Sequence, residues 1–540
     1  MSTKIMADIQ IQNPILPGFN PDPSICRVGN DYYIATSTFE WYPGVQIHHS
    51  TDLVNWTLIA RPLNRPDLLD MRGNPDSCGI WAPCLTHSDG RFYLVYTDVK
   101  RHSGDAKDVH NYITTCEKID GDWSAPIYIN SSGFDPSLFH DDDGRKWFVN
   151  MLWDYRPGKP KFGGIVLQEL DAKSLKPFGP VRNIFHGSEL GMEEGPHLYK
   201  RNGYYYLLTA EGGTEYNHAS TLARSRDIAG PYELHPLTHI VTSRSNPQAH
   251  LQRAGHGDWV ETLEGETFFV HLCSRPLRNR GRSPLGRETA IQRLEWRDDG
   301  WPWPLEGDPT PRVEVAPPTG LDVSRTPQPR EQHCDFSSSQ LPIDFQWLRM
   351  PYPEELFSLT ERPGYLRLFG RESLGSLFRS ALVARRQQAL CYTATTTLEF
   401  EPEHFQQMAG LVCYYNSRKY HYLYVSHDEQ LGRCLAIMSC EGDANGHARY
   451  PLGESPIALP DGPIRLRADV QFEHLYFSYA LSNDDWRRLP FKLEYSWLSD
   501  EAGTGAGNNF TGAFVGMAAQ DLAGTAQPAD FADFHYQELS

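Results

Sequence analysis

The chain alternates short polar turns with strands rich in apolar and aromatic residues, and in its first half this alternation repeats five times. Each copy has a short motif, a polar turn and then an aromatic-rich strand, and these strands are expected to begin at Asp31, Arg91, Lys146, Tyr204 and Thr267. The copies lie 60, 53, 60 and 62 residues apart when they are aligned at Pro23, Pro83, Pro136, Pro196 and Asp258. One such hairpin cannot bury both of its faces, so the period predicts a radial β-repeat such as a propeller.

The second half of the chain has a different pattern, which begins near Cys334. Here polar and apolar residues alternate with period two, which is typical of half-buried antiparallel strands in a β-sandwich. The predicted strands lie at residues 392–400, 410–415, 420–426, 464–470 and 475–480. Between the halves, the strand 287–296 is expected to close the repeats. The prolines that follow it disfavour regular ladders and predict a linker. We therefore divide the chain into 13–310, a linker at 311–333, and 334–540.

The composition argues against several classes of function. The chain has 540 residues, which favours two domains. Its formal net charge of −18 argues against a nucleic-acid partner, since there is no basic surface to bind phosphates. No stretch approaches 18 consecutive apolar residues, so a membrane span is not expected. The first residues lack an apolar signal segment, and the ten scattered cysteines fit free thiols, so we expect a cytoplasmic location.

The repeated motif also carries candidate chemistry. If it marks the innermost strand of each repeat, its variable residues converge on the central axis, and these are Asp22, Trp81, Asp135, Glu194 and His256. An Asp before Pro is by itself usually a turn residue. Turn acids in separate repeats have no structural reason to converge, so three acids at one focus predict an active site.

Several segments together resemble the β-xylosidases of glycoside hydrolase family 43. They are Asn20-Pro-Asp-Pro-Ser, Trp81-Ala-Pro, Gly133-Phe-Asp-Pro-Ser and Met192-Glu-Glu-Gly-Pro-His. The C-terminal half, with Phe510-Thr-Gly-Ala-Phe-Val-Gly, resembles the sandwich that follows the propeller in two-domain members. The resemblance implies an all-β fold, a five-bladed β-propeller followed by a concanavalin-like β-sandwich that contributes to the active site. It also implies an exo-acting, inverting hydrolase that releases D-xylose from the non-reducing end of short β-1,4-xylooligosaccharides, with side α-L-arabinofuranosidase activity.

The resemblance assigns a role to each site residue. Asp22 corresponds to the general base, Glu194 to the general acid, and Asp135 to the acid that orients Glu194 and tunes its pKa. Three acids suit inversion, which needs a proton donor and an ionised base on opposite faces of the sugar. Glu193 should point the other way along its strand and is interpreted as structural. The residues expected to bind substrate are Phe39, Trp81, His256, Arg287 and Phe510.

Other readings stay open at the level of sequence. The enzyme could be primarily an α-L-arabinofuranosidase. A retaining fructosidase would need Asn-Asp-Pro-Asn near the start and Glu-Cys at the acid, which this chain lacks. A non-catalytic sugar-binding propeller would have no need of three converging acids. Arg287 could simply pair with a blade acid, and Phe510 could pack inside the sandwich.

The chemistry itself calls for no metal or cofactor. Some family members carry calcium on the propeller axis, so the resemblance allows a Ca²⁺ ion near His256, with a structural or tuning role. The expected partner is a xylooligosaccharide, without nucleic acid or membrane. The family resemblance also implies a homo-oligomer, a dimer or a tetramer.

Overall fold

The structure is a computed structural model that describes residues 9–320, 330–453, 455–482, 485–503 and 509–539. Residues 321–329 of the predicted linker, residues 504–508 ahead of Phe510, the N-terminal residues 1–8, and Ser540 lie outside this range. The described part contains 39 strands, three short 3₁₀ turns (Leu305–Gly307, Pro353–Glu355 and Tyr495–Trp497) and no α-helix. It has no helix long and apolar enough to cross a bilayer. The prediction of an all-β fold is confirmed.

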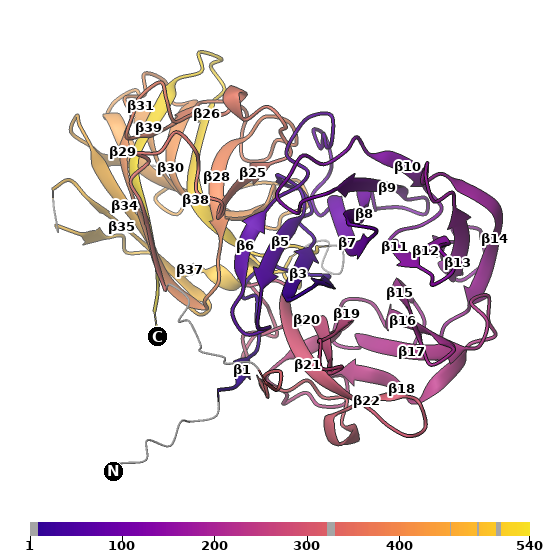
Figure 1. Cartoon of the computed structure of the whole chain (residues 1–540). Coiled ribbons are helices and arrows are strands. Elements are labelled where there is room, and N and C mark those ends of the chain that lie inside the picture. The colour runs from indigo at the N-terminus through magenta and orange to yellow at the C-terminus, as the bar shows by residue number, and fades with distance from the viewer. Residues whose placement is uncertain (1–8, 321–329, 454, 483–484, 504–508, 540) are drawn as a thin grey trace, which may run out of the picture.

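Five four-stranded antiparallel sheets stand around a central axis and form a five-bladed propeller (Figure 1). The first blade is β2 (Ser24–Val28), β3 (Asp31–Thr36), β5 (Gln46–Ser50) and β6 (Thr57–Ala60). The second is β7 (Gly79–Ser88), β8 (Arg91–Arg101), β9 (Asp108–Cys116) and β10 (Ile127–Asn130). The third is β11 (Ser137–His140), β12 (Lys146–Trp153), β13 (Phe162–Leu170) and β14 (Pro177–Phe185). The fourth is β15 (Glu194–Arg201), β16 (Tyr204–Glu211), β17 (Ala219–Ser225) and β18 (Glu233–Thr242). The fifth is β19 (Gln252–Glu261), β20 (Thr267–Ser274), β21 (Glu288–Trp296) and β22 (Pro302–Pro304).

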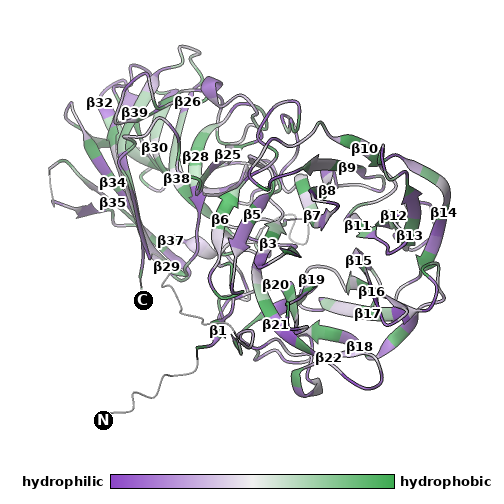
Figure 2. Ribbon diagram, viewed as in Figure 1, coloured by the Kyte–Doolittle hydropathy of each residue, from purple (hydrophilic) through white to green (hydrophobic). Residues whose placement is uncertain are grey.

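The aromatic-rich strands lie where the sequence pattern predicts them. The second strand of every blade begins at the residue expected from the repeat, and each pairs with an inner strand that carries the motif. In β20 every side chain is buried, because both faces of this sheet are covered by neighbouring blades. Figure 2 shows apolar and polar stretches along the strands of the blades.

The start of each inner strand is kinked in the same way. Each blade has a residue with a left-handed backbone at the motif: Asp22 (φ 55°), Ala82 (φ 34°), Asp135 (φ 53°), Gly195 (φ 56°) and His256 (φ 40°). In the second, fourth and fifth blades the pairing register shifts at this point. A bulge of this kind turns a side chain out of the regular in–out alternation. The kinks therefore aim side chains from all five blades at the axis.

The end of the propeller differs from the sequence-based expectation. β21 is not the closing strand, because β22, at residues Pro302–Pro304, pairs with its outer edge. Proline is tolerated there because an outermost strand needs no amide donors on its free side. Within the predicted linker, β23 (Glu314–Val315) pairs with β1 (Ile11–Gln12) and ties the two ends of the propeller together.

The C-terminal half folds into two antiparallel sheets that enclose a large apolar core. One sheet has the order β26-β27-β39-β29-β34-β35-β36, with β24 on β39 and β37 on β35, and the other has β33-β32-β31-β30-β38-β28-β25-β4. The last two strands of the chain, β38 and β39, thus lie in the middle of the two sheets. The strands up to β31 are β24 (Glu331–Cys334), β25 (Phe345–Leu348), β26 (Phe357–Ser358), β27 (Leu366–Phe369), β28 (Ala381–Arg386), β29 (Cys391–Glu399), β30 (Gln407–Asn416) and β31 (Lys419–Asp428). The remainder are β32 (Gly432–Glu441), β33 (Ile457–Ala458), β34 (Ile464–Gln471), β35 (His474–Ala480), β36 (Arg487–Arg488), β37 (Leu493–Glu494), β38 (Phe514–Asp521) and β39 (Pro528–Glu538).

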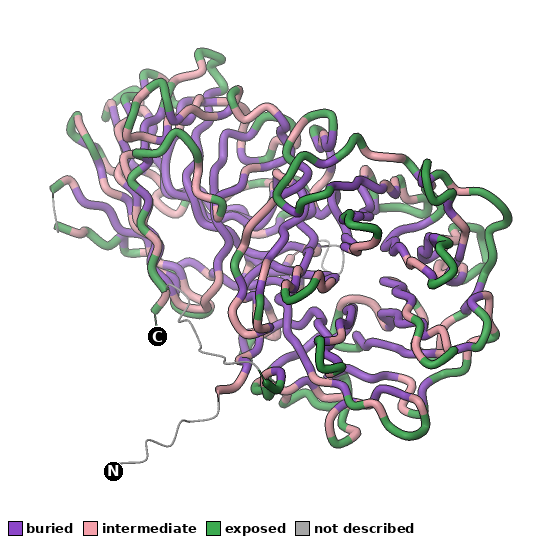
Figure 3. The backbone as a smooth tube through the Cα atoms, in the orientation of Figure 1, coloured by how far each residue is buried: buried purple, intermediate pink, exposed green. Residues whose placement is uncertain are grey.

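The two domains share a continuous buried interface. The propeller lends a two-residue strand, β4 (Trp41–Tyr42), to the edge of a sandwich sheet through β25. The Trp41 ring stacks on Phe514, with centroids 3.6 Å apart. One apolar cluster runs from the propeller axis into the sandwich, and Figure 3 shows buried backbone where the domains meet. The sandwich is therefore positioned to complete a site on the propeller.

Candidate active site

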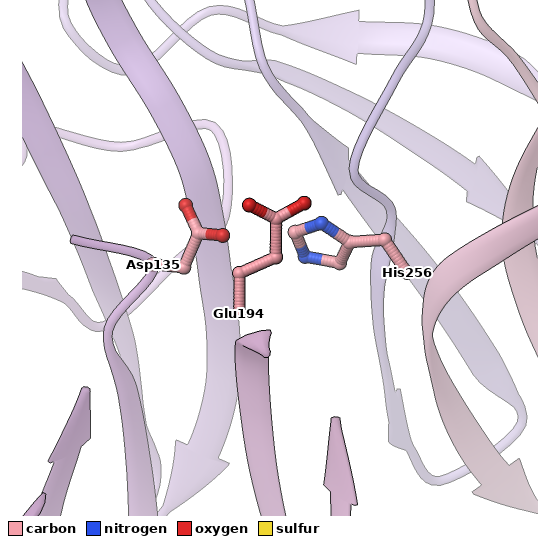
Figure 4. A group of neighbouring side chains, drawn as sticks. All are labelled: Asp135, Glu194 and His256. Carbon is pink, nitrogen blue, oxygen red and sulfur yellow. The ribbon is translucent and has the colours of Figure 1, made fainter. Parts of the chain in front are cut away.

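Three of the predicted site residues meet on the propeller axis. Asp135, Glu194 and His256 each place a carboxylate oxygen or ring nitrogen within 4.8 Å of the others. Figure 4 shows the Glu194 carboxyl between the Asp135 carboxyl and the His256 ring. Asp22 belongs to the same group, because its Oδ1 lies 3.7 Å from Nδ1 of His256. We call Asp22, Asp135, Glu194 and His256 the axial site.

Both oxygens of the Asp22 carboxylate are fixed by hydrogen bonds. Ser37 Oγ donates to Oδ2 at 2.7 Å, and Arg287 Nη1 donates to Oδ1 at 2.8 Å. Asp22 is 5% exposed, and the left-handed kink before β2 directs it to the axis. The guanidinium and the hydroxyl hold the carboxylate through charge-assisted and neutral hydrogen bonds. This arrangement suits a base that must be ionised and held in one orientation.

Asp135 and Glu194 are two carboxyl groups that compete for protons. The pKa of Glu194 is raised to about 7, mainly by burial and then by the Asp22 charge, while Arg287 and Lys107 oppose the shift. Burial, Glu194 and Asp22 raise the pKa of Asp135 well above its ordinary range. Two carboxyls this close repel one another when both are ionised, so the pair holds a proton more tightly than an isolated carboxyl would, as a proton donor requires.

Asp135 also contacts the backbone that carries Glu194. The amide of Gly195 donates to Asp135 Oδ2 at 3.2 Å, which ties the carboxyl to the residue that follows the predicted acid. A side chain at position 195 would not fit, because an added Cβ would lie 2.6 Å from Nε2 of His256. The close packing of these groups makes the glycine necessary and fixes the direction of Glu194.

His256 is electrically neutral in this environment. Burial lowers its pKa to about 4, and the nearby Asp22 only partly opposes this shift. Together with Asp135 and Glu194, its ring nitrogen could in principle hold a metal. Calcium takes six to eight oxygen ligands, more than these side chains offer, and an ion on Glu194 would keep that carboxyl ionised. The three side chains therefore do not fit a calcium ion that they would hold together.

Aromatic rings from both domains line the axial site. The Phe39 and Trp81 rings of the propeller lie 5.7 Å apart between centroids. Phe510, from the sandwich, lies 6.2 Å from Phe39 and 5.6 Å from Trp81. Phe510 thus packs against propeller residues rather than inside the sandwich core, and the rings form an apolar wall beside the carboxyl groups.

Arg287 connects Asp22, the predicted base, to Phe510 in the aromatic wall. Its Nη1 donates to Asp22, and its Nη2 donates to the backbone oxygen of Phe510 at 2.9 Å. The sequence left two interpretations of Arg287 open. It does pair with a blade acid, Asp22, and its position beside the aromatic rings is also one from which it could bind a sugar. The Nε atom of Arg287 has no hydrogen-bond partner among the described residues.

Glu193 immediately precedes β15, and its carboxyl contacts residues outside the axial site. It is fully buried, and the Ser188 amide donates to its Oε1 at 2.6 Å. Burial and the neighbouring Glu211 raise its pKa to about 8. The interpretation of Glu193 as a structural residue agrees with this placement.

Sequence reasoning missed two residues that act on the predicted acid and base. Ser37 binds Asp22 and also accepts a hydrogen bond from the Ala82 amide at 2.8 Å, which joins the first two blades. Lys107 is near enough to influence Glu194, and its ammonium lies 4.4 Å from the Trp153 ring centre. Neither residue lies in the repeated motif, so no pattern in the sequence pointed to them.

Comparisons with known proteins agree with this geometry. Residues 11–302 match the model of glycosyl hydrolases family 43, and residues 333–537 match the beta xylosidase C-terminal concanavalin A-like domain. The chain is 57% identical over 532 residues to xylosidase/arabinosidase 43B of Humicola insolens, with 98% of each protein covered. It is 51% identical over 540 residues to a beta-xylosidase of Bacillus subtilis (strain 168), with 98% of this chain and all of the relative covered. The crystal structure of xylan beta-1,4-xylosidase from Bacillus halodurans C-125 superposes with a TM-score of 0.94 at 51% identity, covering 98% of this chain and 100% of that one.

Proposed function

The chain belongs to glycosyl hydrolases family 43, and from this membership we propose that it is an exo-acting, inverting β-xylosidase. Its substrates are short β-1,4-xylooligosaccharides, from which it releases D-xylose at the non-reducing end. The relatives named xylosidase/arabinosidase 43B and beta-xylosidase are 57% and 51% identical to this chain over nearly its full length. The observation that carries the proposal is the axial site, where a carboxylate bound by Arg287 lies near two buried carboxyls whose pKa values are raised.

The proposed reaction assigns one task to each acid. Glu194 gives its proton to the glycosidic oxygen as the bond from that oxygen to the anomeric carbon breaks. Asp22 takes a proton from a water whose oxygen attacks the anomeric carbon from the opposite face. Asp135, through the Gly195 amide, holds Glu194 in place. The attack from the opposite face inverts configuration, so a β-linked substrate yields α-xylose first.

The exo mode follows from the position of the sandwich. An open propeller axis would allow a polymer to pass across the site. Phe510 extends from the second domain to Phe39 and Trp81 beside the axial site. The proposal is that this ring ends the site after one or two sugars, with Arg287 beside it to bind hydroxyl groups.

The test is hydrolysis of xylobiose followed by proton NMR. Release of α-xylose ahead of its mutarotation supports the proposal. First-formed β-xylose would mean retention and would remove Asp22 from its role as base. No hydrolysis of xylobiose or of an aryl xyloside would favour a non-catalytic sugar-binding protein.

α-L-Arabinofuranosidase activity is the second candidate, and the Humicola relative has a name that includes both activities. Arabinofuranose and xylopyranose present similar hydroxyl groups, so one site can accept both. Initial rates on matched aryl xyloside and aryl arabinofuranoside substrates give the ratio. A larger kcat/KM on the arabinofuranoside would make the enzyme primarily an arabinofuranosidase.

Three further expectations belong to the proposal. The chemistry needs no metal, so kcat/KM should be unchanged after chelation and dialysis, and loss that calcium restores would contradict this. A homo-oligomer, either dimer or tetramer, should appear in light scattering. The enzyme acts in the cytoplasm on imported oligosaccharides; its ten cysteines are free thiols, which suits a reducing compartment.

A further inference from the structure

Phe510 is held by its backbone between the two domains. Its amide donates to Ser77 Oγ at 3.1 Å, and its carbonyl oxygen accepts a hydrogen bond from Arg287. Both partners belong to the propeller. The ring is half-buried against Trp81 and Phe39, so its position decides how that side of the axial site is shaped. The sandwich must therefore hold the residues on either side of Phe510 in place, so that the ring stays against Trp81 and Phe39.

Two consecutive residues of β30 hold the residues on either side of Phe510. The Tyr415 hydroxyl accepts a hydrogen bond from the Thr511 amide at 3.1 Å. The next side chain, Asn416, donates through Nδ2 to Asn509 Oδ1 at 3.3 Å. Tyr415 and Thr511 are each fully buried. β30 is an interior strand of its sheet, so it provides a rigid support for this loop.

A buried acid at the domain interface orients Tyr415. The Tyr415 hydroxyl donates to Asp500 Oδ1. The other Asp500 oxygen lies 3.6 Å from Nη2 of Arg253, a residue of β19 in the propeller. Arg253 also binds Glu501 at 2.6 Å, and its Nε donates to the Thr214 backbone. A buried carboxylate needs such a partner, so this connection is complete only when the domains are docked.

We propose that Tyr415, oriented by Asp500 and Arg253, is a positioning residue that sets the place of Phe510 beside the substrate. The line of contacts runs from the propeller through Arg253, Asp500, Tyr415 and Thr511 and returns to the propeller at Phe510. It makes the shape of the substrate site depend on correct docking of the sandwich. The inference rests on the proposed function, because it takes the axial site as the place where a xylosyl unit binds.

The experiment compares Tyr415→Phe with Tyr422→Phe. Tyr422 is a matched control: it is equally buried in the same sandwich sheet, and its hydroxyl donates to the Ala518 backbone at 2.9 Å, away from Phe510. Each variant loses one buried hydroxyl. Tyr415→Phe removes two buried hydrogen bonds, the one to Asp500 and the one from the Thr511 amide, and should lower kcat/KM on xylobiose about tenfold, mainly through a higher KM. Tyr422→Phe loses one buried hydrogen bond and should lower thermal stability while keeping wild-type kinetics.

A double mutant shows whether Tyr415 acts through Phe510. Phe510→Ala should itself raise KM, and adding Tyr415→Phe to it should then have little further effect. Fully additive losses would overturn the proposal, and so would a Tyr415→Phe variant with the kinetics of Tyr422→Phe. Equal kinetic damage in both tyrosine variants would also overturn it, since it would indicate general weakening of the sandwich.

A crystal structure of Tyr415→Phe gives a reading independent of activity. The Phe510 ring should be displaced from Trp81, and an undisturbed ring would refute the inference. Failure of the proposed function is separate, because it would appear in the wild-type enzyme as no cleavage of xylobiose.

Discussion

The pH dependence of catalysis tests the central electrostatic feature of the site. If Glu194 is the proton donor, it must be protonated, so activity falls as pH rises through its pKa. Burial and the Asp22 charge raise that pKa to about 7. The value of kcat/KM for xylobiose should therefore be near its maximum at pH 5.5, about half at pH 7, and about a tenth at pH 8.

The magnitude of the loss depends on the leaving group. Xylobiose has a poor leaving group, so Glu194→Gln should cost about 10²- to 10⁴-fold in kcat/KM at pH 6, or roughly 3 to 5 kcal/mol of transition-state stabilisation. A 4-nitrophenyl xyloside needs little proton donation, so the same variant should lose far less on it. The assay is initial-rate kinetics on both substrates between pH 5 and 9, and kcat/KM reports the free enzyme.

Glu189→Gln provides the matched control, because Glu189 is exposed and lies in the segment that leads into β15, the strand that begins at Glu194. Its pH profile should equal that of the wild type. The reasoning is refuted if the basic limb for xylobiose lies near pH 5, where an ordinary glutamic acid titrates, or if the limb persists in Glu194→Gln. Equal damage on the two substrates would also exclude Glu194 as the acid.

Three more predictions follow from the same set of contacts. Asp135 and Glu194 compete for protons, so Asp135→Asn removes a carboxyl whose ionisation would repel that of Glu194, and the basic limb for xylobiose should move to lower pH; an unmoved limb would leave Asp135 with a structural role alone. Glu40 is buried at the domain interface, where burial raises its pKa to about 8 from an ordinary 4.5. The folded state therefore binds more protons than the unfolded state. The stabilisation from Glu40 is full below about pH 4.5 and is lost as pH rises to about 8. Glu40→Gln should therefore flatten the decline of Tm between pH 5 and 8, and a parallel decline in calorimetry would contradict this. A chain truncated after Gly320 should be inactive or insoluble, since it exposes Trp41 and other interface residues; xylobiose cleavage at the full-length rate would show that the sandwich is not part of the site.

The parts of the fold that repeat were the parts that sequence could predict. The five aromatic strands begin where the pattern places them, because each must bury two faces and the motif marks its turn. The outer strand at Pro302–Pro304 was missed, because proline is unfavourable in most strands and is tolerated here only by the free edge. The two-residue strand Trp41–Tyr42 has no pattern of its own and exists only through its tertiary partner, β25.

The candidate site likewise contains residues that the sequence predicted and residues that it did not. Asp22, Asp135 and Glu194 could be proposed because equivalent positions in separate repeats converge on one axis. Ser37 and Lys107 lie outside the motif, and their importance comes from contacts between blades and loops that a one-dimensional pattern does not contain. Phe510 could be placed only by resemblance, since a loop residue can fold back or reach across, and packing between domains decides which.

The central position of the last strands has a consequence for how the protein is made. β38 begins four residues after Phe510 and is flanked by β30 and β28, while β39 lies between β27 and β29. On the ribosome the propeller emerges first, but neither sandwich sheet can close until these final strands have been synthesised. Earlier sandwich strands must wait with unpaired edges, a state prone to aggregation. Catalytic competence should thus arise only after β38 and β39 have been synthesised, and a chain terminated before them should yield a substrate for proteolysis rather than a partly active enzyme.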